Sequence, residues 1–131
     1  MEKVILDSDI IIDYLRTGKS RYEELLNLQS AGKIQLYLSS VTVMELFAGR
    51  MDAETNKLLS ELVNNFPVIP FDKELARFTG VAKNGQKVNL PLADYIIAQT
   101  AIYLKAKLAT RNLKHFRQIK SLKFYPFPAS P

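Results

Sequence analysis

Four acidic side chains stand in hydrophobic surroundings where they could bind a cation. Asp7 and Asp9 interrupt the stretch VILDSDIIIDYL, Glu45 lies in SSVTVMELFAG, and Asp94 lies in LPLADYIIAQTA. Burying an unpaired carboxylate is costly, and gathering several together raises the cost because like charges repel. A divalent cation would offset both costs. Oxygen ligands without histidine or cysteine favour Mg²⁺ or Mn²⁺, so the residue types predict a site for one of these ions.

Each of these acids also has a simpler interpretation when it is taken alone. Asp7 follows a strand and could cap the next helix, and Asp94 could be a favourable charge in a first helical turn. Asp13 is expected to pair with Arg16 or to face water. His115 is the only histidine, and we expect it at the surface or against the backbone rather than as a general base. The chain has no cysteine, which excludes disulfides and thiolate chemistry.

Short apolar stretches alternate with helical patterns along the chain, and this alternation predicts an α/β sandwich around a parallel sheet. Strands are expected at about 3–6, 34–38, 68–69 and 107–109, with a last edge strand at 124–125 before an irregular proline-rich tail, 126–131. Helices are expected at about 9–16, 20–31, 40–49, 53–65, 72–81, 92–105 and 113–116, and the segment KNGQKVNLP is expected to be a loop.

The predicted strands place the polar residues at one edge of the sheet. Asp7 and Asp9 follow the first strand, Glu45 lies one turn into the helix after the second, and the segment 110–112 follows the strand LAT. A right-handed connection brings Asp94 to the same edge. Ligands of parallel α/β sheets bind outside the carboxyl ends of the strands. Three carboxylates that are distant in sequence are therefore expected to converge there.

Composition indicates a basic protein with an anionic partner. The 131 residues suit a single domain, 1–131, and 18 Lys and Arg against 13 Asp and Glu give a net charge of +5. From Lys105 onward the chain has no acidic residue, and nucleic acid is the commonest partner of such a surface. No apolar stretch approaches the roughly 20 residues that span a bilayer, and the N-terminus lacks the layout of a signal peptide. We therefore expect a cytoplasmic protein without a membrane partner.

Four motifs in order, LDSD, SSVTVMELFAG, LPLADYIIAQTA and LATRNLKHF, resemble the PIN-domain nucleases, specifically the small VapC-type toxins of prokaryotic toxin–antitoxin pairs. The resemblance covers essentially the whole chain. It implies a three-layer α/β/α sandwich with a central parallel sheet of four to five short strands. It also implies a metal-dependent RNA endonuclease that uses a metal-activated water, a VapB-like antitoxin whose tail blocks the site, and a homodimer.

The resemblance also implies roles for single residues. Asp7, Glu45 and Asp94 match the acidic residues that bind Mg²⁺ or Mn²⁺ and carry catalysis. The fourth acidic position of the family corresponds to Asn112, which has no negative charge, so Asn112 and Asp9 are expected to act through water. The residues expected to support the site are Ser40, Thr110 and Asn112, and those expected to hold RNA phosphates are Arg111, Lys114 and Arg117.

Two alternatives stay open on sequence grounds. Because Asn112 cannot supply charge, the chain could be a PIN-fold module that binds RNA or a protein partner without cleavage. A strand followed by D-x-D also opens the haloacid-dehalogenase-like phosphotransferases, in which the first Asp is a nucleophile. The chain is short for that fold, however, and has no adjacent pair of acids at the end of a later predicted strand.

Overall fold

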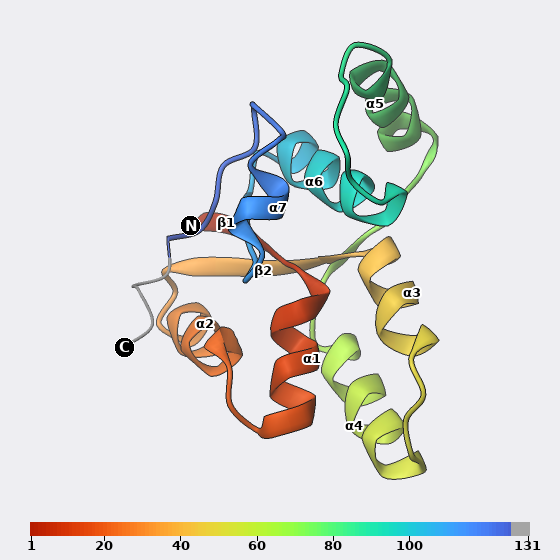
Figure 1. The fold of residues 1–131 in the computed structure, drawn as a ribbon. Helices are drawn as coiled ribbons and strands as arrows, with labels where there is room; N and C mark the ends of the chain where they lie inside the picture. The colour runs from red at the N-terminus through yellow and green to blue at the C-terminus, as the bar shows by residue number, and fades with distance from the viewer. Residues whose placement is uncertain (127–131) are drawn as a thin grey trace.

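The structure is a computed structural model that describes residues 1–126, and it contains a parallel β-sheet with helices on both faces (Figure 1). The sheet has four strands in the order β3-β2-β1-β4, and every neighbouring pair is parallel. The fold predicted from the sequence, an α/β sandwich around a parallel sheet of four to five strands, is confirmed. The strands are β1 (Glu2–Leu6), β2 (Ile34–Ser39), β3 (Val68–Ile69) and β4 (Lys107–Ala109).

The helices form two layers, one on each face of the sheet. In Figure 1, α1, α2 and α4 lie below the sheet, α5, α6 and α7 lie above it, and α3 lies beside the end of β2. None of the helices that the structure describes has the length and apolar character needed to cross a membrane. Their bounds are α1 (Ser8–Thr17), α2 (Arg21–Ser30), α3 (Ser40–Ala48), α4 (Ala53–Asn64), α5 (Lys73–Asn84), α6 (Leu92–Leu104) and α7 (Leu113–Phe116).

Strand β1 separates two hydrophobic cores. Successive side chains of a strand point to opposite faces, so Val4 and Leu6 pack into the core beside α1 and α2, whereas Ile5 packs into the core beside α6 and α7. All three side chains are fully buried. A strand that is covered on both faces reads as a continuous apolar run, which is why VIL could be recognised as a central strand.

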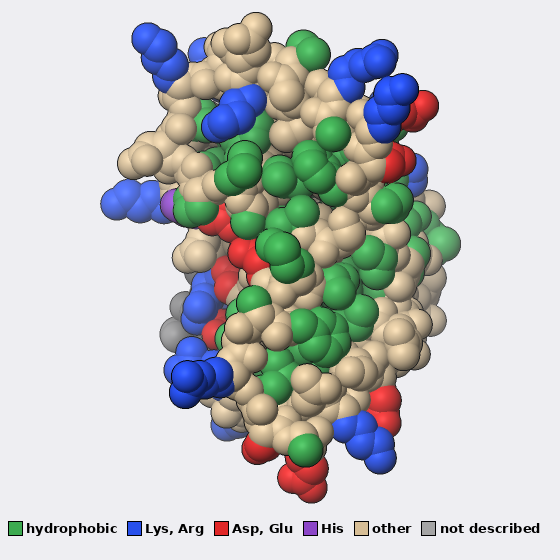
Figure 2. Space-filling model, turned by 90° about the vertical axis from the view of Figure 1, so that its right-hand side faces the viewer, with side chains coloured by type: hydrophobic (Ala, Val, Ile, Leu, Met, Phe, Trp, Pro, Cys, Tyr) green, Lys and Arg blue, Asp and Glu red, His purple; other side chains and the backbone are tan. Residues whose placement is uncertain are grey.

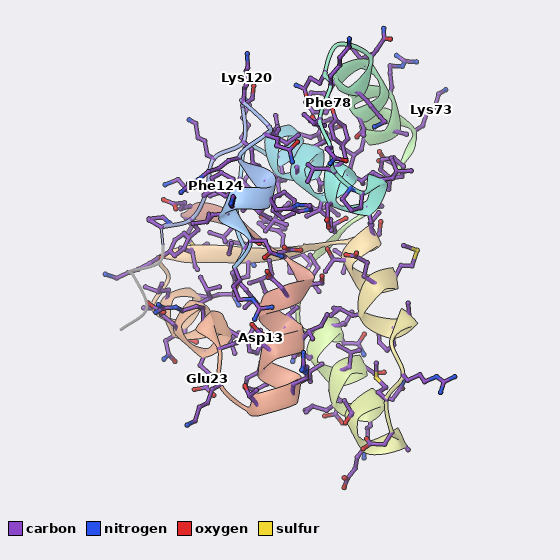
Figure 3. The ribbon with its side chains drawn as sticks, in the orientation of Figure 1. Asp13, Glu23, Lys73, Phe78, Lys120 and Phe124 are labelled. Carbon is purple, nitrogen blue, oxygen red and sulfur yellow. The ribbon has the colours of Figure 1, made fainter. Side chains whose placement is uncertain are left out.

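Helix α5 is longer than the sequence predicted. It continues to Asn84 rather than ending near residue 81, and so includes the first residues of the expected loop. Two side chains of α5 contact α6. The ring of Phe78, labelled in Figure 3, packs edge-on against the ring of Tyr103, with the ring centroids 5.3 Å apart. Lys83 Nζ lies 4.9 Å from the centroid of the Tyr95 ring. These tertiary contacts extend the helix past the residue where local sequence signals suggested an end.

The last expected strand is reduced to a single bridge. Phe124 pairs in parallel with Leu108, and the backbone N–H of Tyr125 donates to the Leu108 carbonyl at 2.9 Å. Pro126, which follows, has no N–H and cannot donate a ladder hydrogen bond. The expected irregular tail lies outside the described residues from position 127 onward.

Candidate active site

Asp7 is placed at the carboxyl edge of the sheet by strand register. The parallel pairing sets Leu6 beside Ala109, and the backbone N–H of Asp7 donates to the Ala109 carbonyl at 2.9 Å. The next residue of β1 and the next residue of β4, Asp7 and Thr110, therefore lie side by side. Asp7 also caps α1, because its Oδ1 accepts a hydrogen bond from the Ser8 N–H at 2.8 Å. The capping interpretation of Asp7 is thus confirmed, and its role as a metal ligand stays a prediction.

A single buried hydroxyl links the first two acids. Thr110 Oγ1 lies 2.8 Å from Asp7 Oδ2 and 3.3 Å from Asp9 Oδ2, and it accepts from the Asn112 N–H at 3.0 Å. Asp9 Oδ2 also accepts from the Arg111 N–H at 3.1 Å. A hydroxyl has one proton to donate, so Thr110 cannot satisfy both carboxylates fully. The same bonds fix the loop between β4 and α7 against the start of α1.

Burial makes ionisation of these acids unfavourable. It raises the pKa of Asp7 to about 7, and the negative charges of Asp9 and, more weakly, Asp94 act in the same direction. The hydrogen bonds from Thr110 and Ser8 lower the pKa of Asp7 only in part. Burial also raises the pKa of Asp9. The pair therefore holds less negative charge at neutral pH than two exposed carboxylates would.

Glu45 and Asp94 reach the same edge from two packed helices. Ser39 ends β2 and caps α3 by accepting from the Val41 N–H at 3.1 Å, and α3 packs against α6, which carries Asp94 in its first turn. Burial raises the pKa of Glu45, and the charge of Asp94 raises it further, against a hydrogen bond from the Ser8 side chain. The structure thus places Asp94 within electrostatic range of both Asp7 and Glu45. Figure 2 shows acidic side chains gathered in a band on this face.

Two carboxylate oxygens of this cluster suit a cation. Asp9 Oδ1 and Glu45 Oε1 are buried, and neither accepts a hydrogen bond from the described residues. Buried polar atoms are nearly always satisfied, and hard oxygen donors fit Mg²⁺ or Mn²⁺. As they are placed, no three acidic or histidine side chains of residues 1–126 are arranged to hold an ion. Binding would thus require carboxylate rotations that bring these oxygens together.

Asp13 and Ser40 make contacts that the sequence did not predict, and the predicted pairing of Asp13 with Arg16 is wrong. Asp13, labelled in Figure 3, does not rely on Arg16 or water: its Oδ2 forms an ion pair with Arg111 Nη1 at 3.0 Å. Asp13 lies one helical turn after Asp9, on the same face of α1, and that face is turned toward the loop after β4. The hydroxyl of Ser40 accepts from the Phe71 N–H at 3.0 Å. It therefore holds the segment after β3, and its predicted role in supporting the carboxylates stays a prediction.

His115 is partly exposed at the surface, as expected, but its contact with a carboxylate was not predicted. Its Nε2 lies 3.0 Å from Asp94 Oδ2, so it contacts one of the three acids instead of only the solvent or the backbone. The signal that could have found it is spacing. Asn112 and His115 are three residues apart on a helical turn and so share one face. A motif that brings residue 112 to the site also brings residue 115 near it. Ser8 was missed as well, although it stands between the two acids of LDSD.

A basic depression adjoins the acids on the α7 side. It is open to solvent and has a volume of about 550 Å³. Two members of it already contact carboxylates: His115 contacts Asp94, and Arg111 pairs with Asp13, although the Arg111 side chain remains 63% exposed. The structure therefore places positive side chains directly beside the carboxylate cluster. The depression is lined by Arg111, Asn112, Leu113, Lys114, His115 and Arg117.

The fold and the site together define a class: α/β proteins that gather carboxylates at the carboxyl edge of a parallel sheet. The PIN domain family matches residues 4–122 of this chain. The chain therefore belongs to the PIN-domain family. This membership excludes the phosphotransferase alternative, whose first Asp would act as a nucleophile.

Comparison with known proteins places VapC proteins among its relatives. Ribonuclease VapC10 of Mycobacterium tuberculosis is 31% identical over 123 residues, which are 92% of this chain and 90% of that protein. Two solved structures share the fold. VapBC2 from Rickettsia felis bound to a promoter DNA fragment matches with a TM-score of 0.83 and 20% identity, covering 96% of this chain and 99% of that one. DNA-bound VapBC from Salmonella typhimurium matches with a TM-score of 0.79 and 22% identity, covering 95% and 98%.

Proposed function

We propose that this chain is a metal-dependent RNA endonuclease, the VapC-type toxin of a toxin–antitoxin pair. The observation that supports this best is the carboxylate cluster of Asp7, Glu45 and Asp94, in which burial raises the pKa of Asp7 and of Glu45 and the charge of Asp94 raises both further. The 31% identity to a protein named Ribonuclease VapC10 supports RNA as the substrate. The protein would act in the cytoplasm, where RNA is available.

In this proposal, Asp7, Glu45 and Asp94 hold one or two Mg²⁺ or Mn²⁺ ions. Such an ion lowers the pKa of a bound water and stabilises the charge that develops on the phosphate. The chain supplies the rest. Thr110 holds the Oδ2 atom of Asp7 from one side, while the Ser8 N–H holds Oδ1 from the other. Asp9 accepts a hydrogen bond from the loop that carries Asn112. Asp9 and Asn112 would therefore shape the site without binding the ion directly.

The nuclease activity is the direct test of this proposal. We expect the purified protein to cleave RNA with Mg²⁺ or Mn²⁺ and to lose cleavage in EDTA. Asp94→Asn should reduce the rate by at least about 100-fold, because even outer-shell partners of a metal contribute 10- to 100-fold. Glu61→Gln, which neutralises an exposed carboxylate on α4, is the matched control and should cleave normally.

The opposite outcome would favour the alternative function. If the protein binds several RNAs, tRNA included, but does not cut any of them at saturating Mg²⁺ or Mn²⁺, it is a PIN-fold binding module. In that case Asn112 accounts for the loss, since it lacks the charge that the fourth acidic position supplies.

We further propose that RNA phosphates contact Lys114 and Arg117 in the basic depression, together with the exposed guanidinium of Arg111. Removing a phosphate contact to a single strand lowers the slope of log K against log salt by about 0.7. The double variant Lys114→Ala, Arg117→Ala should therefore bind RNA more weakly in EDTA and lose a slope of about 1.4. Lys57→Ala, an exposed lysine on α4, should leave both unchanged. If the double variant and wild type show equal slopes of log K against log salt, Lys114 and Arg117 do not contact RNA phosphates.

The partners follow from the same proposal. A VapB-like antitoxin is supported by the fold shared with VapBC complexes. A homodimer is supported by exposed hydrophobic side chains near the site, including Met44 and Phe47 on α3, which are 61% and 38% exposed. Figure 2 shows that hydrophobic side chains form a broad area beside the acidic band. A second copy of this chain is the occupant that we propose for it.

A further inference from the structure

The contact between His115 and Asp94 joins two helices, and the two residues are 21 positions apart in the sequence. His115 Nε2 lies 3.0 Å from Asp94 Oδ2, and the side chains are 37% and 22% exposed. Asp94 comes from the first turn of α6, and His115 comes from the single turn of α7. The imidazole therefore reaches across from the basic depression to one oxygen of a predicted metal ligand.

Several contacts fix the ring in this place. It packs edge-on against Phe116, with centroids 5.6 Å apart, and Phe116 is only 1% exposed. The carbonyl of His115 accepts from Gln118 Nε2 at 3.1 Å. The same Gln118 side chain donates to the Asn89 carbonyl at 3.2 Å and accepts from the Asn89 N–H at 2.8 Å. Helix α7 is thereby tied to the loop that leads into α6, so His115 and Asp94 are held in register with each other.

We propose that His115 is a positioning residue for Asp94. Its Nε2–H donates to Oδ2, which sets the plane of the carboxylate and leaves Oδ1 available toward Glu45 and Asp7. Carboxylates that bind metals are generally oriented by such hydrogen bonds, and losing the partner weakens metal affinity 10- to 100-fold. The inference rests on the proposed metal site, and it gives the only histidine of the chain a role in that site.

A purely structural role is the competing explanation. The contact could serve only to hold α7 against α6. Such a role predicts that substitutions of His115 change the free energy of unfolding but leave metal affinity unaltered. A positioning role predicts that metal affinity falls when a substitution removes the hydrogen-bond donor and is retained when the donor is kept.

Two variants of similar size separate these roles. His115→Gln retains an N–H donor, whereas His115→Phe retains a ring that can pack on Phe116 but has no donor. We expect Mn²⁺ to bind His115→Phe 10- to 100-fold more weakly than wild type in a calorimetric titration without RNA. His115→Gln should stay within about threefold of wild type. Lys120→Ala, an exposed residue beyond α7 labelled in Figure 3, is the control and should bind normally.

The chain has one histidine, so every imidazole signal in the NMR spectrum of the tag-free protein comes from His115. NMR therefore tests the contact in the wild-type protein, without a substitution. We expect the ¹⁵N signals of the ring to show a protonated Nε2, and Mn²⁺ to broaden them at substoichiometric concentration. If wild type binds no Mn²⁺, the metal-site proposal fails and this inference fails with it. If wild type and His115→Phe bind Mn²⁺ equally, or Nε2 carries no proton, only the positioning role of His115 is overturned.

Discussion

Asp7→Asn is expected to abolish RNA cleavage and at the same time to make the metal-free protein more stable. Asp7 is 4% exposed, and burial raises its pKa from 3.8 to about 7. Above pH 7 the Asp7 carboxylate is ionised in both the folded and the unfolded state. Ionising it costs more free energy in the folded state, because its pKa is higher there. A difference of about three pKa units corresponds to about 4 kcal/mol as an upper bound. The neutral asparagine avoids this penalty.

The hydrogen bonds of Asp7 can be kept by asparagine. The amide oxygen of Asn can accept from the Ser8 N–H in place of Asp7 Oδ1, which now does so at 2.8 Å. The Thr110 hydroxyl, which now donates to Asp7 Oδ2, can accept from the new amide and turn its proton to Asp9, 3.3 Å away. The substitution should therefore keep both of the hydrogen bonds described for Asp7, and the gain in stability should not be cancelled by a lost bond.

The effect of Asp7→Asn on stability has a defined pH dependence. For an acid with a raised folded pKa, the folded state binds more protons than the unfolded state between the two pKa values, so stability falls as pH rises through that range. Wild type without metal should thus lose stability from about pH 4 to about pH 7. The variant should match wild type near pH 4 and exceed it by a few kcal/mol near pH 8.

Urea unfolding of both proteins in EDTA at several pH values measures this difference. Glu61→Gln removes an exposed carboxylate on α4 and should behave as wild type at every pH. An Asp7→Asn protein that is less stable than wild type at pH 8 would show that Asp7 stabilises the fold, chiefly as the cap of α1. An active Asp7→Asn protein would remove Asp7 from the metal site.

The gathering of the acids could be predicted from sequence because it depends on a general property of parallel sheets. The carboxyl ends of β1 and β4 meet at one edge, and the two helices that carry Glu45 and Asp94 begin there. A short apolar run followed by polar residues predicts where a strand ends. The architecture and the convergence of Asp7, Glu45 and Asp94 could therefore be inferred before any coordinates, whereas their role as metal ligands stays a prediction.

The finer contacts could not be predicted, because they depend on which neighbour each helix face meets. Asp13 had Arg16 nearby in sequence, but the fold brings Arg111 to its face of α1. The Ser40 hydroxyl bonds to a segment that is 31 residues away. His115 meets Asp94 only because Gln118 ties α7 to the loop before α6. Contacts of this kind are set by tertiary packing, which local sequence signals do not encode.

Binding of Mn²⁺ is expected to weaken steeply below pH 7. A metal ligand must be deprotonated to bind, so a proton on Asp7 competes with the ion. Because the pKa of Asp7 is raised to about 7, one competing proton should reduce the affinity about tenfold for each pH unit below that value. Between pH 7 and pH 5 the dissociation constant should therefore rise about 100-fold.

Calorimetric titration with Mn²⁺ in buffers of different ionisation enthalpy measures both the affinity and the number of protons released. Near pH 6 we expect close to one proton per ion, and His115→Gln should show the same pH dependence if the proton comes from Asp7 rather than from the imidazole. At a Mn²⁺ concentration of 100 times the dissociation constant, the free energy of unfolding should rise by about 2.7 kcal/mol. The ion would then offset much of the penalty that the buried carboxylates impose at neutral pH. A dissociation constant that stays unchanged from pH 5 to pH 8 would mean that Asp7 does not bind the metal, and the cluster would need another explanation for its burial.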